Sequence, residues 1–162
     1  MSADPAGRVM GIDYGSRRVG VAVSDPLRIL AGPLAALAND ETLIDRLCAL
    51  AAAQEAVLVV VGMPYAADGG KGQKAREVEE FLGRLRARLP VPVVTWDESY
   101  TSVDAHRAFL AGGMKRKQRR QKSRVDVMAA RLLLQEYLEH LHAVPPTDPD
   151  SRGRHDGPPA MQ

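Results

Sequence analysis

The sequence predicts an α/β fold in which a mixed five-stranded sheet carries helices on both faces. The N-terminal third contains three strand-like segments joined by short connections, which is typical of an antiparallel meander. Helical and apolar strand-like segments then alternate, which is typical of parallel strands joined by helical crossovers. At 162 residues, with 45% apolar and 26% charged residues, the chain has the size and composition of one globular domain.

The meander is predicted from three short segments. Residues Arg8 to Tyr14 and Arg18 to Asp25 are apolar enough to form two buried strands. The connection Gly15-Ser16-Arg17 is short and begins with a glycine that can adopt positive φ, as a hairpin requires. A weaker third strand is predicted from Pro33 to Leu37, which completes three antiparallel strands.

The first helix and the next strand follow directly. Asn39 or Asp40 can cap a helix from Glu41 to Gln54. Four apolar residues recur there at helical spacing: Leu43, Ile44, Leu47 and Leu50. The run AVLVVVG, from Ala56 to Gly62, is continuously apolar and predicts a strand that is covered on both faces.

A glycine-rich loop, Asp68 to Gly72, precedes a predicted helix from Gln73 to Leu89. Backbone N–H groups of such a loop can bind phosphate, but the loop lacks the full nucleotide-binding pattern G-x-x-x-x-G-K-[ST]. A short strand from Val91 to Trp96 then ends at the acidic pair Asp97-Glu98. The helix from Gln73 and the strand from Val91 thus supply the last predicted strand of the sheet and a helix that covers it.

Two more helices complete the prediction. The first begins at Thr101 or Ser102 and stops before Gly112-Gly113. The second begins with the S-x-x-D spacing of Ser123 to Asp126 and continues to about His142. Residues 8–143 are thus expected to form the domain, with residues 1–7 as a flexible N-terminus. Residues 144–162, which are rich in proline and poor in apolar side chains, are expected to be a disordered tail.

The chain has the features of a cytoplasmic protein. Its single cysteine, Cys48, excludes an intramolecular disulfide and favours a reducing compartment. No apolar run approaches the roughly 20 residues of a membrane span, and no apolar segment near the N-terminus predicts a signal peptide. A cytoplasmic location with no membrane partner is therefore expected.

The positive charge is concentrated in one basic segment, residues 115–124, which contains no acid. Its seven cations are Lys115, Arg116, Lys117, Arg119, Arg120, Lys122 and Arg124. The whole chain has 22 basic and 20 acidic residues, a net charge of +2. Outside the basic segment, 15 basic residues stand against 20 acidic ones, so the rest of the chain is acidic. An acidic body with one dense basic segment attracts a polyanion locally, and the lack of interleaved aromatics predicts phosphate contacts without base stacking.

Three acidic residues lie where an α/β sheet commonly places its active site. Asp13 is late in the first strand, Glu98 follows the last strand, and Asp126 begins the final helix. Clustered carboxylates repel one another, and a divalent cation relieves that repulsion. Oxygen ligands suit Mg²⁺ or Mn²⁺, and two such ions about 3.5–4 Å apart can support phosphodiester hydrolysis. Taken singly, Asp13 also fits a turn residue and Asp126 an ordinary helix-start acid.

Four blocks of the sequence together resemble one family. They are VMGIDYGSRRVGVAVSDP, VVVGMPYAADGGKG, VVTWDESYTSVDAHRAFLAGG and KRKQRRQKSRVDVMAARLLLQEYL, in this order. In these blocks the chain resembles the YqgF family, also called the RuvX or Holliday junction resolvase family. The resemblance implies an RNase H-like mixed five-stranded sheet with a carboxylate metal site at Asp13, Glu98 and Asp126. It also implies resolvase-like nuclease activity and a role in maturing the 5′ end of precursor 16S rRNA.

The sequence departs from the family pattern in two places. Ser99 follows Glu98 where the family usually has arginine, and Ala66-Ala67 stands where Asn-Met is usual. Neither change removes a carboxylate. Both bear on how a substrate is positioned.

The leading hypothesis is a metal-dependent nuclease that acts on precursor rRNA or on branched DNA. Asp13, Glu98 and Asp126 are its expected catalytic residues and ligands for Mg²⁺ or Mn²⁺, with two ions expected. The expected backbone contacts are Arg17 and Arg18 together with the seven cations of the basic segment. An alternative is a non-catalytic ribosome-assembly factor that binds rRNA through the same basic residues. An actin-like or hexokinase-like phosphotransferase is a third reading, although those proteins duplicate the fold and this chain supplies one lobe.

The oligomeric state stays open at this point. A homodimer is one option, because a resolvase must cut two symmetric strands.

Overall fold

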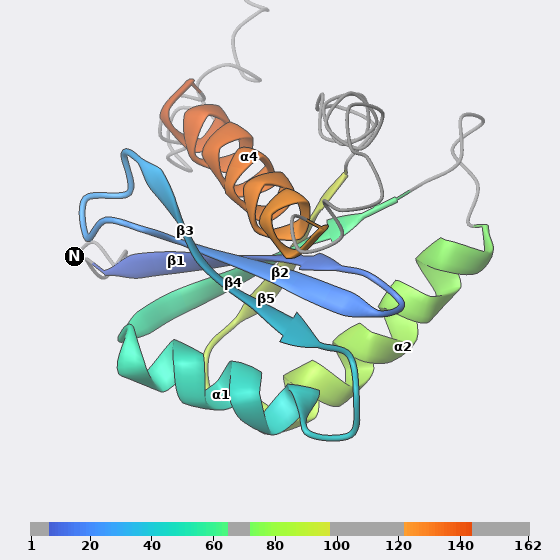
Figure 1. Cartoon of the computed structure of the whole chain (residues 1–162). Helices are drawn as coiled ribbons and strands as arrows, with labels where there is room; N and C mark the ends of the chain where they lie inside the picture. The colour runs from blue at the N-terminus through green and yellow to red at the C-terminus, as the bar shows by residue number, and fades with distance from the viewer. Residues whose placement is uncertain (1–6, 65–71, 98–121, 144–162) are drawn as a thin grey trace, which may run out of the picture.

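A five-stranded mixed sheet forms the centre of the fold in the computed structural model, which describes residues 7–64, 72–97 and 122–143 (Figure 1). The strands are β1 (Arg8–Tyr14), β2 (Arg18–Ser24), β3 (Ala31–Ala38), β4 (Ala56–Met63) and β5 (Val93–Asp97). The helices of the described ranges are α1 (Leu43–Ala53), α2 (Gln73–Arg88) and α4 (Lys122–Ala143).

The strand order across the sheet is β3-β2-β1-β4-β5. The pairs β1–β2 and β2–β3 are antiparallel, whereas β1–β4 and β4–β5 are parallel. This arrangement confirms the predicted meander followed by parallel strands. One row of the ladder matters for the site, because Asp13 pairs with Gly20, which in turn pairs with Ala36.

Helices cover both faces of the sheet, as the sequence predicts. α4 lies across one face, and α1 and α2 lie against the other (Figure 1). Side chains alternate between the two faces along each strand. Met10 and Ile12 of β1 are buried in the cluster on the α1 and α2 side. Val9 of the same strand is buried on the α4 side with Leu134.

The first helix begins two residues later than predicted. The carboxylate Oδ1 of Asp40 accepts hydrogen bonds from the backbone N–H of Thr42 at 2.9 Å and from its hydroxyl at 2.6 Å. These bonds close a local turn, so the helix begins at Leu43. Of the two predicted caps, Asn39 instead holds the β1–β2 hairpin. Its side-chain Nδ2 donates to the carbonyl of Gly15 at 2.8 Å.

Three other boundaries also differ, one of them in β5, which spans Val93–Asp97 and not Val91 to Trp96. β3 spans Ala31–Ala38 and is longer than predicted, because it pairs with β2 over the whole length of that strand. α4 already includes Lys122, so Ser123 lies inside the helix and is not its cap. The predicted helix at 101–111, residues 1–6 of the N-terminus and the tail at 144–162 lie outside the described residues. Among residues 7–64, 72–97 and 122–143, no helix is both long and apolar enough to cross a membrane.

Polar side chains of α4 fasten it to the β2–β3 hairpin. Gln135 accepts a hydrogen bond from the N–H of Ala31 at 2.8 Å and donates one to the carbonyl of Ile29 at 3.0 Å. Arg131 donates to the carbonyl of Ala31 at 3.2 Å, and His142 lies 2.8 Å from the carbonyl of Arg28. These bonds fix the C-terminal half of α4 relative to the sheet.

Candidate active site

Asp13 is a buried acid on the sheet face that α4 covers. It is the sixth residue of β1, and its ladder partner is Gly20, so it lies in a strand and not in a turn. Only 2% of its surface is exposed. A carboxylate in such a position costs free energy unless charge or hydrogen bonds compensate it. Asp13 is therefore not an ordinary solvent-exposed acid.

Gly20 allows α4 to approach the sheet at Asp126. A Cβ atom at Gly20 would lie 2.0 Å from the carbonyl oxygen of Asp126, which is a steric overlap with backbone. Gly11 has a similar role about two turns further along α4, since its Cβ would lie 2.8 Å from the Cβ of Leu134. Glycine inside a strand often marks such a close approach. Gly20 therefore adjoins both acids: Asp13 is its ladder partner in the sheet, and the backbone of Asp126 packs against it from α4.

Arg18 makes an ion pair with Asp126. Its Nε donates to Oδ2 of Asp126 at 2.8 Å, and the two side chains are 35% and 14% exposed. The sequence predicts a phosphate contact for Arg18, whereas the structure places its guanidinium on one of the predicted metal ligands. Sequence reasoning missed this pair because its members are 108 residues apart.

The hairpin between β1 and β2 is held from its outer side. Besides the side-chain bond of Asn39 to Gly15, the backbone N–H of Asn39 donates to the carbonyl of Arg17 at 2.9 Å. Arg17 itself is exposed next to Arg18. The hairpin therefore presents Arg17 to solvent close to the end of the strand that carries Asp13.

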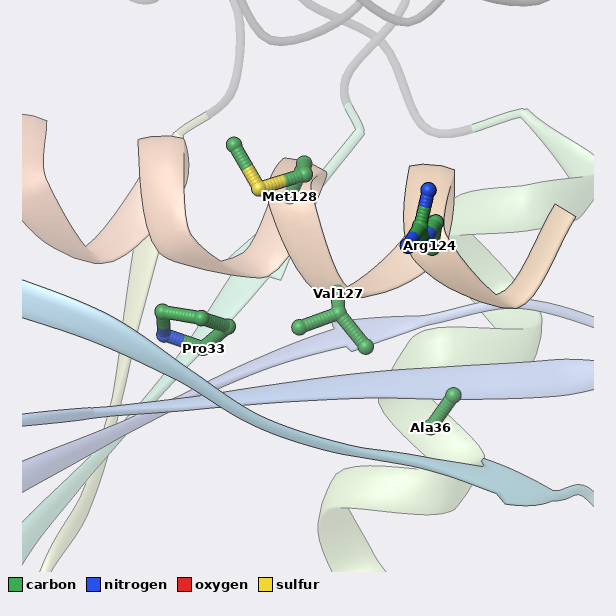
Figure 2. A pocket seen from close by; sticks show the side chains of 5 residues that line it. All are labelled: Pro33, Ala36, Arg124, Val127 and Met128. Atoms are coloured by element: carbon green, nitrogen blue, oxygen red, sulfur yellow. The ribbon is translucent and has the colours of Figure 1, made fainter. Parts of the chain in front are cut away.

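A groove of about 620 Å³ lies between α4 and the edge strand β3 (Figure 2). Its lining residues are Pro33, Ala36, Arg124, Val127 and Met128. Figure 2 shows Val127 pointing from α4 toward the strands, between Pro33 and Ala36. Because Ala36 continues the row from Asp13 through Gly20, the groove lies on the β3 side of α4 and Asp13 on the β1 side. The exposed Arg124 supplies the charge of this otherwise apolar groove.

The remaining predicted site residues are only partly covered by the structure. Lys122 belongs to α4, whereas six of the predicted residues lie outside the described ranges: Glu98, Lys115, Arg116, Lys117, Arg119 and Arg120. Within those ranges, no group of three or more His, Cys, Asp or Glu side chains could hold a metal ion. Glu98 directly follows Asp97, the last residue of β5.

The side chains in the described part of the site are of the chemical type that binds a divalent cation. Asp13 and Asp126 offer carboxylate oxygens, the donors that Mg²⁺ and Mn²⁺ prefer. Asp126 already forms an ion pair with the cationic Arg18, so its carboxylate stabilises a positive charge at this position. Two of the three predicted ligand residues thus adjoin the same glycine, Gly20.

Curated relatives are similar over nearly the whole described chain. A protein from Phocaeicola vulgatus, named "Putative pre-16S rRNA nuclease", is 38% identical over 133 residues, which are 82% of this chain and 95% of that protein. A protein of the same name from Roseiflexus sp. is 38% identical over 141 residues, 86% of this chain and 98% of the relative.

Solved structures share the fold. The RuvC of T. thermophilus in complex with a Holliday junction substrate superposes with a TM-score of 0.53 at 16% identity, covering 85% of this chain and 97% of that one. Thermus thermophilus RuvC alone gives a TM-score of 0.51 at 16% identity, covering 84% and 96%. These likenesses confirm the RNase H-like architecture that the sequence resemblance implies.

A family model matches residues 7–140, which include β1 and nearly all of α4. Its description is "RuvX: Holliday junction resolvase". The match contains all four sequence blocks that carry the resemblance, and the relatives agree with it at 38% identity. The chain belongs to the RuvX family of Holliday junction resolvases.

Proposed function

We propose that this protein is a metal-dependent nuclease whose substrate is the 5′ end of precursor 16S rRNA, branched DNA, or both. The observation that carries the proposal is that two aspartates adjoin Gly20: buried Asp13 is its ladder partner on β1, and the backbone carbonyl of Asp126 on α4 lies against it. The name of the curated relatives supports the RNA substrate. The Holliday junction bound by the RuvC neighbour supports the DNA substrate.

In this proposal Asp13, Glu98 and Asp126 hold one or two Mg²⁺ or Mn²⁺ ions. When bound, such ions activate a water molecule and stabilise the leaving oxygen of a phosphodiester. Asp13 contributes a fixed ligand, because its strand is hydrogen-bonded on both sides. Asp126 contributes a ligand from α4, which can pack closely on the sheet because residue 20 is a glycine. The close approach of β2 and α4 therefore sets the separation of the two carboxylates.

Basic residues around these carboxylates hold the sugar–phosphate backbone. Arg17 on the hairpin and Arg124 on α4 are exposed, and they are joined in this role by the basic segment. Contacts of this kind position a strand without reading its bases. The proposed site of action is the cytoplasm, and a homodimer is the proposed form for a four-way junction, which has two strands to cut.

The test is cleavage of two labelled substrates by the purified protein: a precursor 16S rRNA fragment and a four-way DNA junction. Each is incubated with Mg²⁺ or Mn²⁺, beside the Asp13→Asn variant. Asp45→Asn is the matched control, because it also neutralises an aspartate in an ion pair, with Arg88 on the surface. We expect wild type and Asp45→Asn to cleave and Asp13→Asn to be inactive. Tight rRNA binding with no cleavage by any of the three would instead favour the non-catalytic assembly factor.

A further inference from the structure

The pair of Arg18 and Asp126 differs from an ordinary surface ion pair. Arg18 is the first residue of β2, Asp126 lies on α4, and the bond between Nε and Oδ2 is 2.8 Å long. The Asp126 side chain is only 14% exposed, so solvent screens this pair less than a fully exposed one. A charge-assisted bond of this length is also stronger than a neutral hydrogen bond.

The pair has an electrostatic role in the absence of a metal. Asp13 and Asp126 both adjoin Gly20, and in the proposed site their like charges destabilise one another. Arg18 places one positive charge directly on Asp126. The guanidinium therefore supplies part of the charge compensation that a bound divalent cation would supply.

We infer that Arg18 is an internal counter-cation that occupies Asp126 until a divalent cation binds, and that it competes with that cation for the carboxylate. The inference rests on the proposed function, since it assumes that Asp126 is a metal ligand. On metal binding Arg18 leaves Asp126 and joins the exposed Arg17 of the same hairpin, where it can contact a substrate phosphate. Metal loading and strand binding are then linked through one side chain.

The sign of the effect on metal affinity follows from this competition. Removing Arg18 removes both a competitor for Asp126 and a nearby positive charge that repels the incoming ion. We therefore expect Arg18→Ala to bind Mn²⁺ more tightly, by about three- to tenfold, for a partly exposed charge-assisted bond. The metal-free protein should be less stable, because the ion pair between Arg18 and Asp126 is lost. A residue that merely oriented Asp126 for the metal would give the opposite sign.

The experiment is a calorimetric titration of Mn²⁺ into wild type, Arg18→Ala, Arg18→Lys and Arg131→Ala, with melting temperatures in EDTA and in saturating Mn²⁺. Arg131→Ala is the matched control, because it also removes one arginine that ties α4 to the sheet, at Ala31. Arg18→Ala should bind Mn²⁺ more tightly and gain more in melting temperature from Mn²⁺ than wild type does. Arg18→Lys retains the charge and should lie between wild type and Arg18→Ala. Arg131→Ala should change the Mn²⁺ affinity by less than about twofold, within ordinary surface effects.

Two failures are distinguishable. If wild type binds Mn²⁺ and Asp13→Asn abolishes that binding, but Arg18→Ala binds Mn²⁺ equally or more weakly, the counter-cation inference is overturned while the proposed metal site stands. If wild type binds no Mn²⁺, or binds it regardless of Asp13, the proposed function fails and the inference fails with it. Should Arg18→Ala not fold, the same comparison is made with Arg18→Lys, whose unchanged or weaker Mn²⁺ binding would also overturn the inference.

Discussion

Gly20 of β2 lies so close to Asp126 of α4 that a Cβ atom at Gly20 would stand 2.0 Å from the Asp126 carbonyl oxygen. That oxygen belongs to the backbone of a helix, so it cannot rotate away as a flexible side chain can. The contact sets how deeply α4 lies on the sheet at the position of the two carboxylates. Both the stability of the fold and the geometry of the candidate site therefore depend on this glycine.

Gly20→Ala is expected to lower the free energy of unfolding by about 3 kcal/mol, because the added methyl group forces α4 away from β2. Mn²⁺ affinity should fall with it, since the displacement separates Asp126 from Asp13. Chemical denaturation and Mn²⁺ titration measure the two effects. The control is Gly83→Ala on the exposed side of α2, where a Cβ meets nothing within 4 Å. That change should stabilise the protein by about 0.5–1 kcal/mol through helix propensity. Equal stability of the two variants would contradict the close approach.

Asp13→Asn is expected to abolish metal-dependent cleavage while the protein stays folded. The substitution keeps the shape of the side chain and removes one charge of a repulsive pair, so the melting temperature in EDTA should not fall. Asp126→Asn should also be inactive, but it should melt at a lower temperature because Arg18 loses its ionic partner. Glu98→Gln is the third variant of this set, expected to be inactive as well. Cleavage at the wild-type rate by any of them, or full activity in EDTA, would exclude the proposed ligand set.

Replacing five cations of the basic segment with alanine is expected to weaken nucleic-acid binding to a similar extent for all sequences. These cations are Lys115, Arg116, Lys117, Arg119 and Arg120. Each lost phosphate contact should reduce the salt slope of log K by about 0.9 on duplex DNA or about 0.7 on single strands. Binding titrations at several salt concentrations measure the slope. Arg84→Ala and Arg88→Ala, on the opposite side of the sheet from α4, are the controls and should leave the slope unchanged.

Asp25 is expected to give the stability a pH dependence on the acidic side. The N–H groups of Leu30 and Ile29 donate to its carboxylate at 3.0 and 2.7 Å and hold its pKa below the ordinary value of 3.8. A lowered folded-state pKa stabilises the fold above pH 3.8, and the contribution is lost as the pH falls through the folded-state value. Asp25→Asn should therefore melt below wild type at neutral pH and approach it in acid. Melting curves from pH 2 to 7 check this, with Glu41→Gln at an exposed position as the control. A constant difference over the whole range would contradict it.

Much of the fold could be predicted because the strands carry their own signal. Residues 56–62 are apolar throughout, and that run predicts a buried parallel strand, as β4 is found to be. β3 gives a weak signal because its residues are small, and its true length is decided by pairing with β2. The start of α1 was predicted too early because Asp40 can either cap a helix or close a turn, and the bonds to Thr42 decide for the turn.

The sequence singles out Asp13 and Asp126, but it gives none of the contacts that the structure shows around them. Asp13 stands out in the sequence because an aspartate inside an apolar strand is costly. The position of Asp126 near β2 depends on Gly20, and this role of Gly20 is seen only once α4 is packed on the sheet. The pairing of Arg18 with Asp126 likewise joins residues far apart in the chain, and no local pattern encodes it.

The bonds from Gln135 to the β2–β3 hairpin, with those of Arg131 and His142, let a remote part of α4 influence the geometry of the candidate site. Gln135 lies nine residues beyond Asp126 on the same helix, a span of about 13.5 Å at 1.5 Å per residue. A helix behaves as a rigid rod over that length, so releasing its far end lets the whole rod tilt about its contact with Gly20. A search for inactivating substitutions is thus expected to recover Gln135. A change in the turn of the β2–β3 hairpin would shift the Asp126 carboxylate through α4 and not by direct contact.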